Sequence, residues 1–144
     1  MLNLEREIKE ILEAQARDAV AAGWAEVRVV ETGIGLTFHL EPIKPNAAPL
    51  EIYLDSEELV VCAPGRHDMV CEFFAEDPLE IKRQVEALAA AVVAGSYAER
   101  MKDGSMEVAA EWPGPDGPQE ASRNVLSMVG AEGKPWRAIN YEPY

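Results

Sequence analysis

Cysteine and histidine are the side chains in this sequence whose types would allow metal binding or nucleophilic catalysis. Cys62, His67 and Cys71 lie close together in the chain, and His39 precedes them. Thiolate and imidazole groups are zinc ligands, but the spacing C-x4-H-x3-C matches no close-ligand zinc knuckle. We therefore predict no metal site, and two reduced cysteines that behave as small apolar residues.

Catalysis by either cysteine would require a neighbouring feature that lowers the thiol pKa. The residues flanking Cys62 and Cys71 indicate neither a helix N-terminus nor a glycine turn beside the thiol. The sequence also lacks the glycine-rich GxGxxG and GxxxxGK(S/T) motifs that hold phosphates. We therefore predict no catalytic residue and no cofactor.

Net charge restricts the classes of partner. The 144 residues include 26 acidic and 13 basic side chains, for a net charge of −13. A negative surface repels phosphate backbones and anionic lipids, so we predict that the protein binds neither nucleic acid nor membranes. The charge also exceeds the magnitude of about 2–8 that suffices for the solubility of a small domain. This excess favours a surface that attracts a basic protein partner.

Candidate docking residues come from two groups. The first consists of acidic residues in segments that we expect to be exposed. The second consists of aromatic residues near the C-terminus, because Trp and Tyr are common anchors at interfaces. Trp112, by contrast, continues an apolar strand face and is predicted to lie in the core. The predicted partner-binding residues are Asp55, Glu57, Glu58, Glu72, Glu76, Trp136 and Tyr141.

The first half of the chain changes from helical to strand periodicity. Apolar residues repeat at helical spacing over 3–22, and Gly23 is placed to end that helix. Apolar and polar residues then alternate between turn-forming segments, a pattern typical of an antiparallel sheet covered on one side. Cys62 and Cys71 would face each other across a hairpin. The expected strands cover about 26–29, 36–40, 50–54, 59–63 and 69–74.

A second helix has a clear start signal. Asp77 is the expected N-cap, Pro78 fits the first turn, and Glu80 would complete a capping box. Gly95 is placed to end this helix. Beyond it we expect a hairpin with its turn at 102–105, a surface loop over 113–118, and a final hairpin formed by 120–129 and 135–141.

These elements predict an α+β fold in which two amphipathic helices pack on one face of an antiparallel sheet. The expected order is one helix, four or five strands, a second helix, and three or four strands. No repeat or linker divides the chain, so we expect a single domain over 1–144. The N-terminus lacks a signal-peptide pattern, and two cysteines are few for a secreted scaffold. We therefore expect a cytoplasmic protein, either a monomer or a homodimer.

Two stretches within residues 70–101 carry a resemblance. Phe73–Glu80 reads FFAEDPLE, and Val92–Arg100 reads VVAGSYAER. This arrangement of strand, capped helix and return strand resembles small bacterial immunity proteins, which pair with polymorphic or contact-dependent toxins. The resemblance implies an acidic α+β domain without catalytic residues, which inhibits a cognate toxin by masking its active site.

Three functional hypotheses follow. The first is a non-catalytic, immunity-type inhibitor that masks a basic partner such as a toxin. The second is a type III secretion-like chaperone, which the charge and element order also suit. The third is a small enzyme or ligand-binding protein with a pocket on the sheet, in which His39 or His67 acts as a base beside Tyr53 or Asp55. A pocket of about 300 Å³ or more with converging polar groups would favour the third hypothesis.

Overall fold

The computed structural model describes residues 3–32, 35–55, 58–102, 107–123 and 135–144. Over these residues the chain forms helices and antiparallel strands, which confirms the predicted α+β class. The elements are α1 (Asn3–Gln15), α2 (Arg17–Ala21), β1 (Ala25–Thr32), β2 (Gly35–Pro42), β3 (Leu50–Leu54), β4 (Leu59–Pro64), β5 (Cys71–Phe74), α3 (Pro78–Ala94), β6 (Ala98–Lys102), β7 (Val108–Gly114), β8 (Gly117–Arg123) and β9 (Trp136–Asn140).

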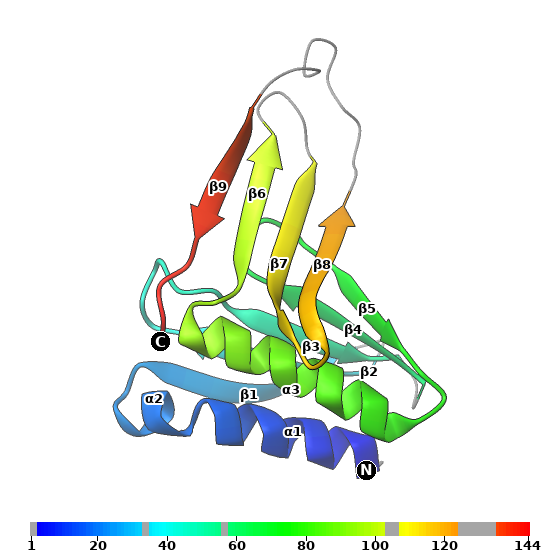
Figure 1. Ribbon diagram of the computed structural model, residues 1–144. Helices are drawn as coiled ribbons and strands as arrows, with labels where there is room; N and C mark the ends of the chain where they lie inside the picture. The colour runs from blue at the N-terminus through cyan, green and yellow to red at the C-terminus, as the bar shows by residue number, and fades with distance from the viewer. Residues whose placement is uncertain (1–2, 33–34, 56–57, 103–106, 124–134) are drawn as a thin grey trace.

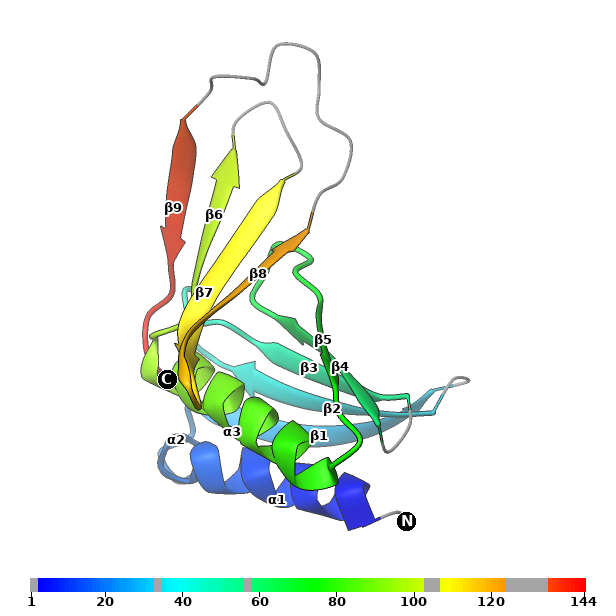
Figure 2. The ribbon, with the colours of Figure 1, turned by 45° about the vertical axis from the view of Figure 1, so that its right-hand side comes forward.

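The strands form two sheets, where we predicted one. A five-stranded sheet has the order β1-β2-β3-β4-β5, and a four-stranded sheet has the order β8-β7-β6-β9. Because α3 separates β5 from β6, β6 is free to pair with β7 and β9 instead of extending the first sheet. The four-stranded sheet rises from the C-terminal end of α3 and extends beyond the five-stranded sheet (Figures 1 and 2).

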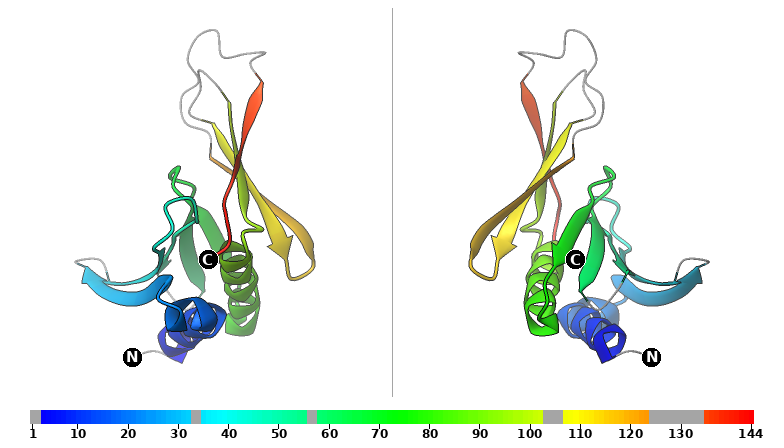
Figure 3. Two further views of the ribbon diagram at one scale, coloured as in Figure 1. Left: turned by 90° about the vertical axis from the view of Figure 1, so that its left-hand side faces the viewer. Right: turned by 90° about the vertical axis from the view of Figure 1, so that its right-hand side faces the viewer.

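The core lies between the helices and one face of the five-stranded sheet. Figure 3 shows α1 and α3 packed side by side against this sheet. Period-two alternation directs every second strand residue toward the helices. Burying each large apolar side chain contributes about 1.5–3 kcal/mol. Fully buried members of this core include Ile8, Leu12, Phe38, Leu40, Leu50, Ile52, Val60, Cys62, Ile81, Val85 and Leu88.

The first predicted helix is interrupted. We expected one helix over 3–22, but the chain departs from helical geometry at Ala16, where φ is −96° and ψ is 3°. Ala16 is fully buried, whereas the following α2 has no buried residue. The chain therefore turns away from the core at Ala16. Gly23 adopts a left-handed φ of 79°, as expected for a residue that ends a helix.

The ends of α3 agree with the local sequence signals. The Oδ1 atom of Asp77 accepts a hydrogen bond of 3.0 Å from the Leu79 amide, which satisfies one of the free donors of the first turn. Gly95 has a left-handed φ of 74° at the C-cap. The carboxylate of Glu80 instead accepts hydrogen bonds from Arg83 and Gln84. Glu80 therefore points along the helix, not back toward Asp77 as a capping box requires.

The four-stranded sheet corrects two predictions. The expected loop over 113–118 is a tight hairpin in which Pro113 pairs with Pro118 and Gly114 with Gly117. The expected final hairpin is also wrong, because β8 pairs with β7 while β9 pairs with β6. The predicted turn residues 103–105 and 130–133 lie outside the described residues.

The prediction that Trp112 belongs to the core is confirmed. Its side chain is buried and contacts Phe73 of β5 in an edge-to-face arrangement, with ring centroids 6.5 Å apart. Such aromatic pairs contribute about 0.5–1.5 kcal/mol beyond the burial of their area. The contact joins the four-stranded sheet to the edge of the five-stranded sheet.

Candidate protein-binding surface

The negative charge of the chain is concentrated in residues 45–81, which form β3, β4, β5 and the start of α3. This segment holds nine acidic residues, with Arg66 as its single Lys or Arg. It therefore accounts for −8 of the net −13. Because β3, β4 and β5 are neighbours in one sheet, the fold keeps these charges together instead of distributing them over the molecule.

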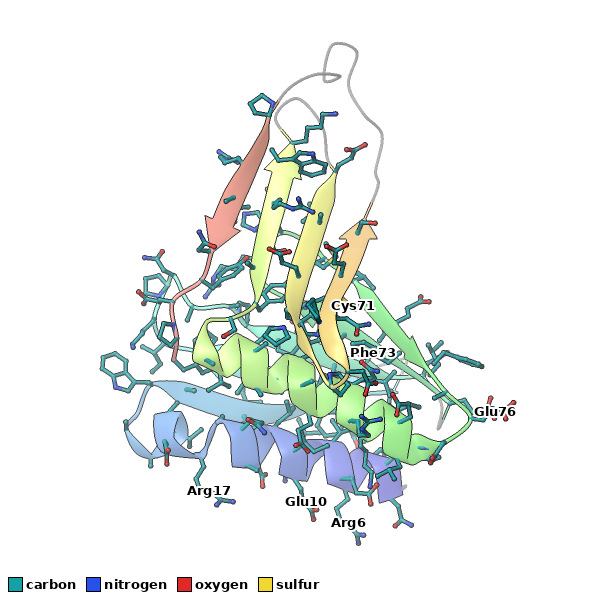
Figure 4. All side chains as sticks on the ribbon, in the orientation of Figure 1. Arg6, Glu10, Arg17, Cys71, Phe73 and Glu76 are labelled. Carbon is teal, nitrogen blue, oxygen red and sulfur yellow. The ribbon has the colours of Figure 1, made fainter. Side chains whose placement is uncertain are left out.

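Three of the predicted docking residues lie at one end of the sheet. Asp55 follows β3, Glu58 precedes β4, and Glu76 lies between β5 and α3. The Ala75 amide donates a 3.0 Å hydrogen bond to the Glu58 carbonyl, so the start of β4 and the end of β5 are adjacent. The fourth residue, Glu72, lies within β5. Figure 4 shows Glu76 at the right-hand side of the molecule, where the chain passes from β5 to α3. Asp55, Glu58, Glu72 and Glu76 are all exposed, and Glu57 lies outside the described residues.

Exposed apolar side chains accompany these carboxylates. Along β5 the buried Cys71 and Phe73 alternate with exposed residues, and Glu72 lies between Val70 and Phe74. The Phe74 side chain is 69% exposed, unusual for an aromatic residue of this size. We define the acidic edge as Asp55, Glu58, Val70, Glu72, Phe74 and Glu76. It combines negative charge with apolar surface, the two properties of a docking site for a basic protein.

The first cations that follow this segment pair with carboxylates outside the acidic edge. Lys82 pairs with Glu7 at 3.3 Å. Arg83 bridges Glu80 and Asp116, at 2.7 and 3.0 Å. Within the part of the chain that the structure describes, no Lys or Arg forms an ion pair with Asp55, Glu72 or Glu76. These three carboxylates remain available to an external cation.

The two predicted aromatic anchors lie elsewhere. Trp136 begins β9 in the four-stranded sheet and is 44% exposed, and the Arg100 guanidinium lies 5.6 Å from the centre of its ring. Figure 1 places the start of β9 at the far end of that sheet, away from the acidic edge. Tyr141 is only 7% exposed. The structure therefore does not assemble all the predicted docking residues into one surface.

Tyr141 belongs instead to a buried polar cluster that the sequence did not indicate. We call it the Glu99 cluster: His67, Glu99 and Tyr141. Glu99 is 1% exposed, and its Oε1 atom accepts a hydrogen bond from the Tyr141 hydroxyl. The His67 Nδ1 atom lies 3.3 Å from the same oxygen. The Arg66 amide donates to the Tyr141 hydroxyl at 2.9 Å. The cluster thus links the β4–β5 turn, β6 and the C-terminal segment.

A histidine beside a buried carboxylate is an arrangement that general bases use. A catalytic role would also require a pocket beside the cluster that is large enough for a substrate. Burial and the hydrogen bond to Glu99 raise the pKa of Tyr141 well above its ordinary value, so the hydroxyl remains a protonated donor. The neighbouring hollow lined by Gly65, Arg66 and Asp68 measures about 190 Å³. Ligand pockets are generally larger, at about 300–1,000 Å³. The geometry favours a structural role for this cluster.

The second histidine lies on the outer face of the five-stranded sheet. His39 pairs with Glu51 across β2 and β3, and its Nδ1 atom lies 3.2 Å from Glu51 Oε1. The Tyr53 hydroxyl donates to the other oxygen of Glu51, and this hydrogen bond raises the pKa of Tyr53 to about 12. His39 and Tyr53 therefore share a carboxylate, whereas the enzyme hypothesis placed Tyr53 or Asp55 beside the histidine. Asp55, which the enzyme hypothesis offered as the alternative to Tyr53, lies beyond the end of β3.

The two cysteines lie opposite each other in β4 and β5, as predicted. Both are free and buried. Burial raises the pKa of Cys62 well above its ordinary value and that of Cys71 to about 12. Both are therefore neutral thiols at pH 7, whereas the nucleophile in cysteine catalysis is the thiolate. Among the described residues, no group of His, Cys, Asp and Glu is arranged to hold a metal ion.

Comparisons with protein-family models, with curated proteins and with solved structures gave no match for this chain. None of the helices in the described ranges has the length and apolar character needed to cross a bilayer.

Proposed function

We propose that this protein is a non-catalytic binding module that inhibits a basic protein, such as a toxin, by covering part of its surface. The observation that carries this proposal is the acidic edge, where the exposed Phe74 side chain accompanies the exposed carboxylates of Asp55, Glu72 and Glu76, with which no Lys or Arg of the described residues forms an ion pair. A basic partner would supply the missing counter-charges, while Phe74 would supply apolar contact area. Charge of this kind accelerates association, and buried aromatic residues commonly hold the complex together.

Two further features support an inhibitor of the immunity type. The segment that resembles immunity proteins, residues 70–101, contains Glu72, Phe74 and Glu76. In addition, α3 begins directly after this surface and anchors it to the core through Ile81 and Val85, both fully buried. A surface held in place by an adjoining packed helix loses little conformational freedom when it binds, which favours affinity.

The experiment compares two charge-reversed variants in affinity capture from the native host. Asp55→Lys/Glu76→Lys reverses two charges in the acidic edge. Glu86→Lys/Glu120→Lys makes the same change in net charge at exposed positions on α3 and β8. We expect the wild type and the control to retain a basic protein that the edge variant loses. The purified partner should lose its own activity when the wild type is added.

The kinetics of this complex provide a second readout. Screening weakens long-range attraction when the Debye length falls from about 30 Å at 0.01 M salt to about 8 Å at 0.15 M. The association rate constant should therefore fall steeply with added salt, and the edge variant should lose that dependence. Equal capture by both double variants, or association rates that salt does not change, would contradict the proposal.

A further inference from the structure

Strand β5 forms one margin of the five-stranded sheet. Its strand neighbour in the described part of the chain is β4, and no strand pairs with its other side there. Figures 1 and 2 show β5 as the last strand of this sheet, next to the start of α3. An open edge offers main-chain donors and acceptors to a strand from another molecule.

The hydrogen-bond register identifies which backbone groups face outward. The Ala75 amide, directly after β5, donates a hydrogen bond to the carbonyl of Glu58, directly before β4. In an antiparallel pair, alternate residues direct their amide and carbonyl groups toward the partner strand. Counting back from Ala75 in steps of two, the amide and carbonyl groups of Phe73 and Cys71 also point toward β4. There they lie opposite Val60 and Cys62. The amides and carbonyls of Glu72 and Phe74 point to the open edge.

The side chains along this edge specify the chemistry of an incoming strand. Glu72 and Phe74 are both exposed, and a hollow of about 250 Å³, lined in part by Glu72, Phe74, Glu80 and Gln84, borders the edge. A charge on an edge strand usually discourages pairing between sheets. A negative charge discourages acidic strands, and it attracts a strand that carries Lys or Arg.

A second copy of this chain fits the edge poorly. Two β5 edges that paired with each other would bring two Glu72 side chains and two acidic edges together, with no described cation paired to Glu72. Like charges directly opposite each other in a sheet are destabilising. The charge therefore favours a basic segment from a different protein.

We propose that β5 binds its partner by strand addition, in which an extended segment with alternating basic and apolar residues pairs with the outward backbone groups of Glu72 and Phe74. This inference rests on the proposed function and specifies its binding mode. The partner's main chain would supply affinity through hydrogen bonds, while its cations would contact Glu72 and Glu76. Because Glu72 and Phe74 share one face of β5, the same cations would cover Phe74 with their aliphatic stems.

The test uses a nine-residue peptide of alternating lysine and valine with both ends capped, and a glutamate–valine peptide of the same pattern as its control. We expect the lysine peptide to bind the wild-type chain and to slow hydrogen exchange at the Glu72 and Phe74 amides at least tenfold. The glutamate peptide should leave both amides unchanged. Binding without protection of these two amides, or no binding of the lysine peptide, would overturn strand addition.

Two variants separate backbone pairing from charge. Glu72→Pro removes one outward amide, and proline is tolerated where an edge-strand amide faces solvent. Glu72→Gln removes the charge and keeps the amide. We expect more than a tenfold loss of peptide affinity for Glu72→Pro and a smaller loss for Glu72→Gln. Should Glu72→Pro fail to fold, the exchange measurement on the wild type still decides the question.

Failure of this inference differs from failure of the proposed function. If the host partner is lost by Asp55→Lys/Glu76→Lys but retained with full affinity by a folded Glu72→Pro, the inhibitor proposal stands and strand addition is wrong. Concentration-dependent protection of Glu72 and Phe74 without any peptide would instead show pairing between copies of this chain, and would also overturn the inference.

Discussion

Gly65 shows how one residue controls the contact between the two sheets. It follows β4 with a left-handed φ of 77°, and a Cβ atom at this position would lie 2.6 Å from the Glu99 Oε1 atom. That distance is far below a normal contact, so only glycine lets the turn approach the buried carboxylate. The approach places His67 and the Arg66 amide within reach of the Glu99 cluster.

We predict that Gly65→Ala destabilises the protein more than Gly23→Ala. Both glycines have a left-handed φ, a conformation that costs other residues about 1–2 kcal/mol. A Cβ atom at Gly23 would meet nothing within 4 Å. At Gly65 it would also displace the Glu99 carboxylate, and a disrupted buried hydrogen bond adds about 1–3 kcal/mol. Urea unfolding measures both losses, and equal losses would show that the close approach to Glu99 is unimportant.

The Glu99 cluster also shows the limit of residue-level prediction. His67 was a candidate in the sequence because of its type, and Tyr141 because of its place near the C-terminus. Neither indicated Glu99, which lies 32 residues from His67 and 42 from Tyr141. The available signal was an acidic residue two positions after Tyr97, on the same face of a strand. Only tertiary contact shows that this carboxylate is buried and hydrogen-bonded.

At the scale of elements, α3 was predicted well because its limits depend on local chemistry. The Asp77 cap, Pro78 and the left-handed Gly95 act within one or two turns of the helix. Strand pairing in the second sheet was predicted less well. Residues close in sequence were assumed to pair, but β9 pairs with β6 on the opposite side of the sheet from β8.

We predict that Asp77→Ala lowers the free energy of unfolding by about 1 kcal/mol, because an N-cap side chain satisfies a free amide in the first turn. The asparagine variant Asp77→Asn keeps a side-chain acceptor and should remain close to the wild type. Glu76→Ala, at the preceding exposed position, controls for the loss of negative charge. Thermal and urea unfolding provide the comparison. A loss for Glu76→Ala as large as that for Asp77→Ala would attribute the effect to charge and not to capping.

At the scale of the whole molecule, the concentration of charge in residues 45–81 should carry a stability cost in the unbound protein. Like charges repel one another in the compact state, and the acidic edge has no described cation paired to Asp55, Glu72 or Glu76. Under the proposed function, a basic partner would relieve this repulsion when it binds.

We predict that Asp55→Lys/Glu76→Lys stabilises the isolated protein at low salt by about 0.5 kcal/mol per reversed charge, a typical value for exposed charge interactions. Added salt should raise the stability of the wild type and should reduce the difference from the variant, because it screens the repulsion. Glu86→Lys/Glu120→Lys, with the same net charge, should gain less. Urea unfolding at low and physiological salt measures these differences. Equal gains for the two double variants would show that the negative charge is not concentrated at the acidic edge.

The sequence by itself determined the α+β class, the caps of α3, the opposed cysteines and the strong negative charge. Each of these depends on residue type, on short-range periodicity or on the chemistry of a single turn. Tertiary structure decided the division into two sheets, the burial of Tyr141 beside Glu99, and the separation of Trp136 from the acidic edge. These features depend on pairing and packing between residues far apart in the chain, which local pattern does not specify.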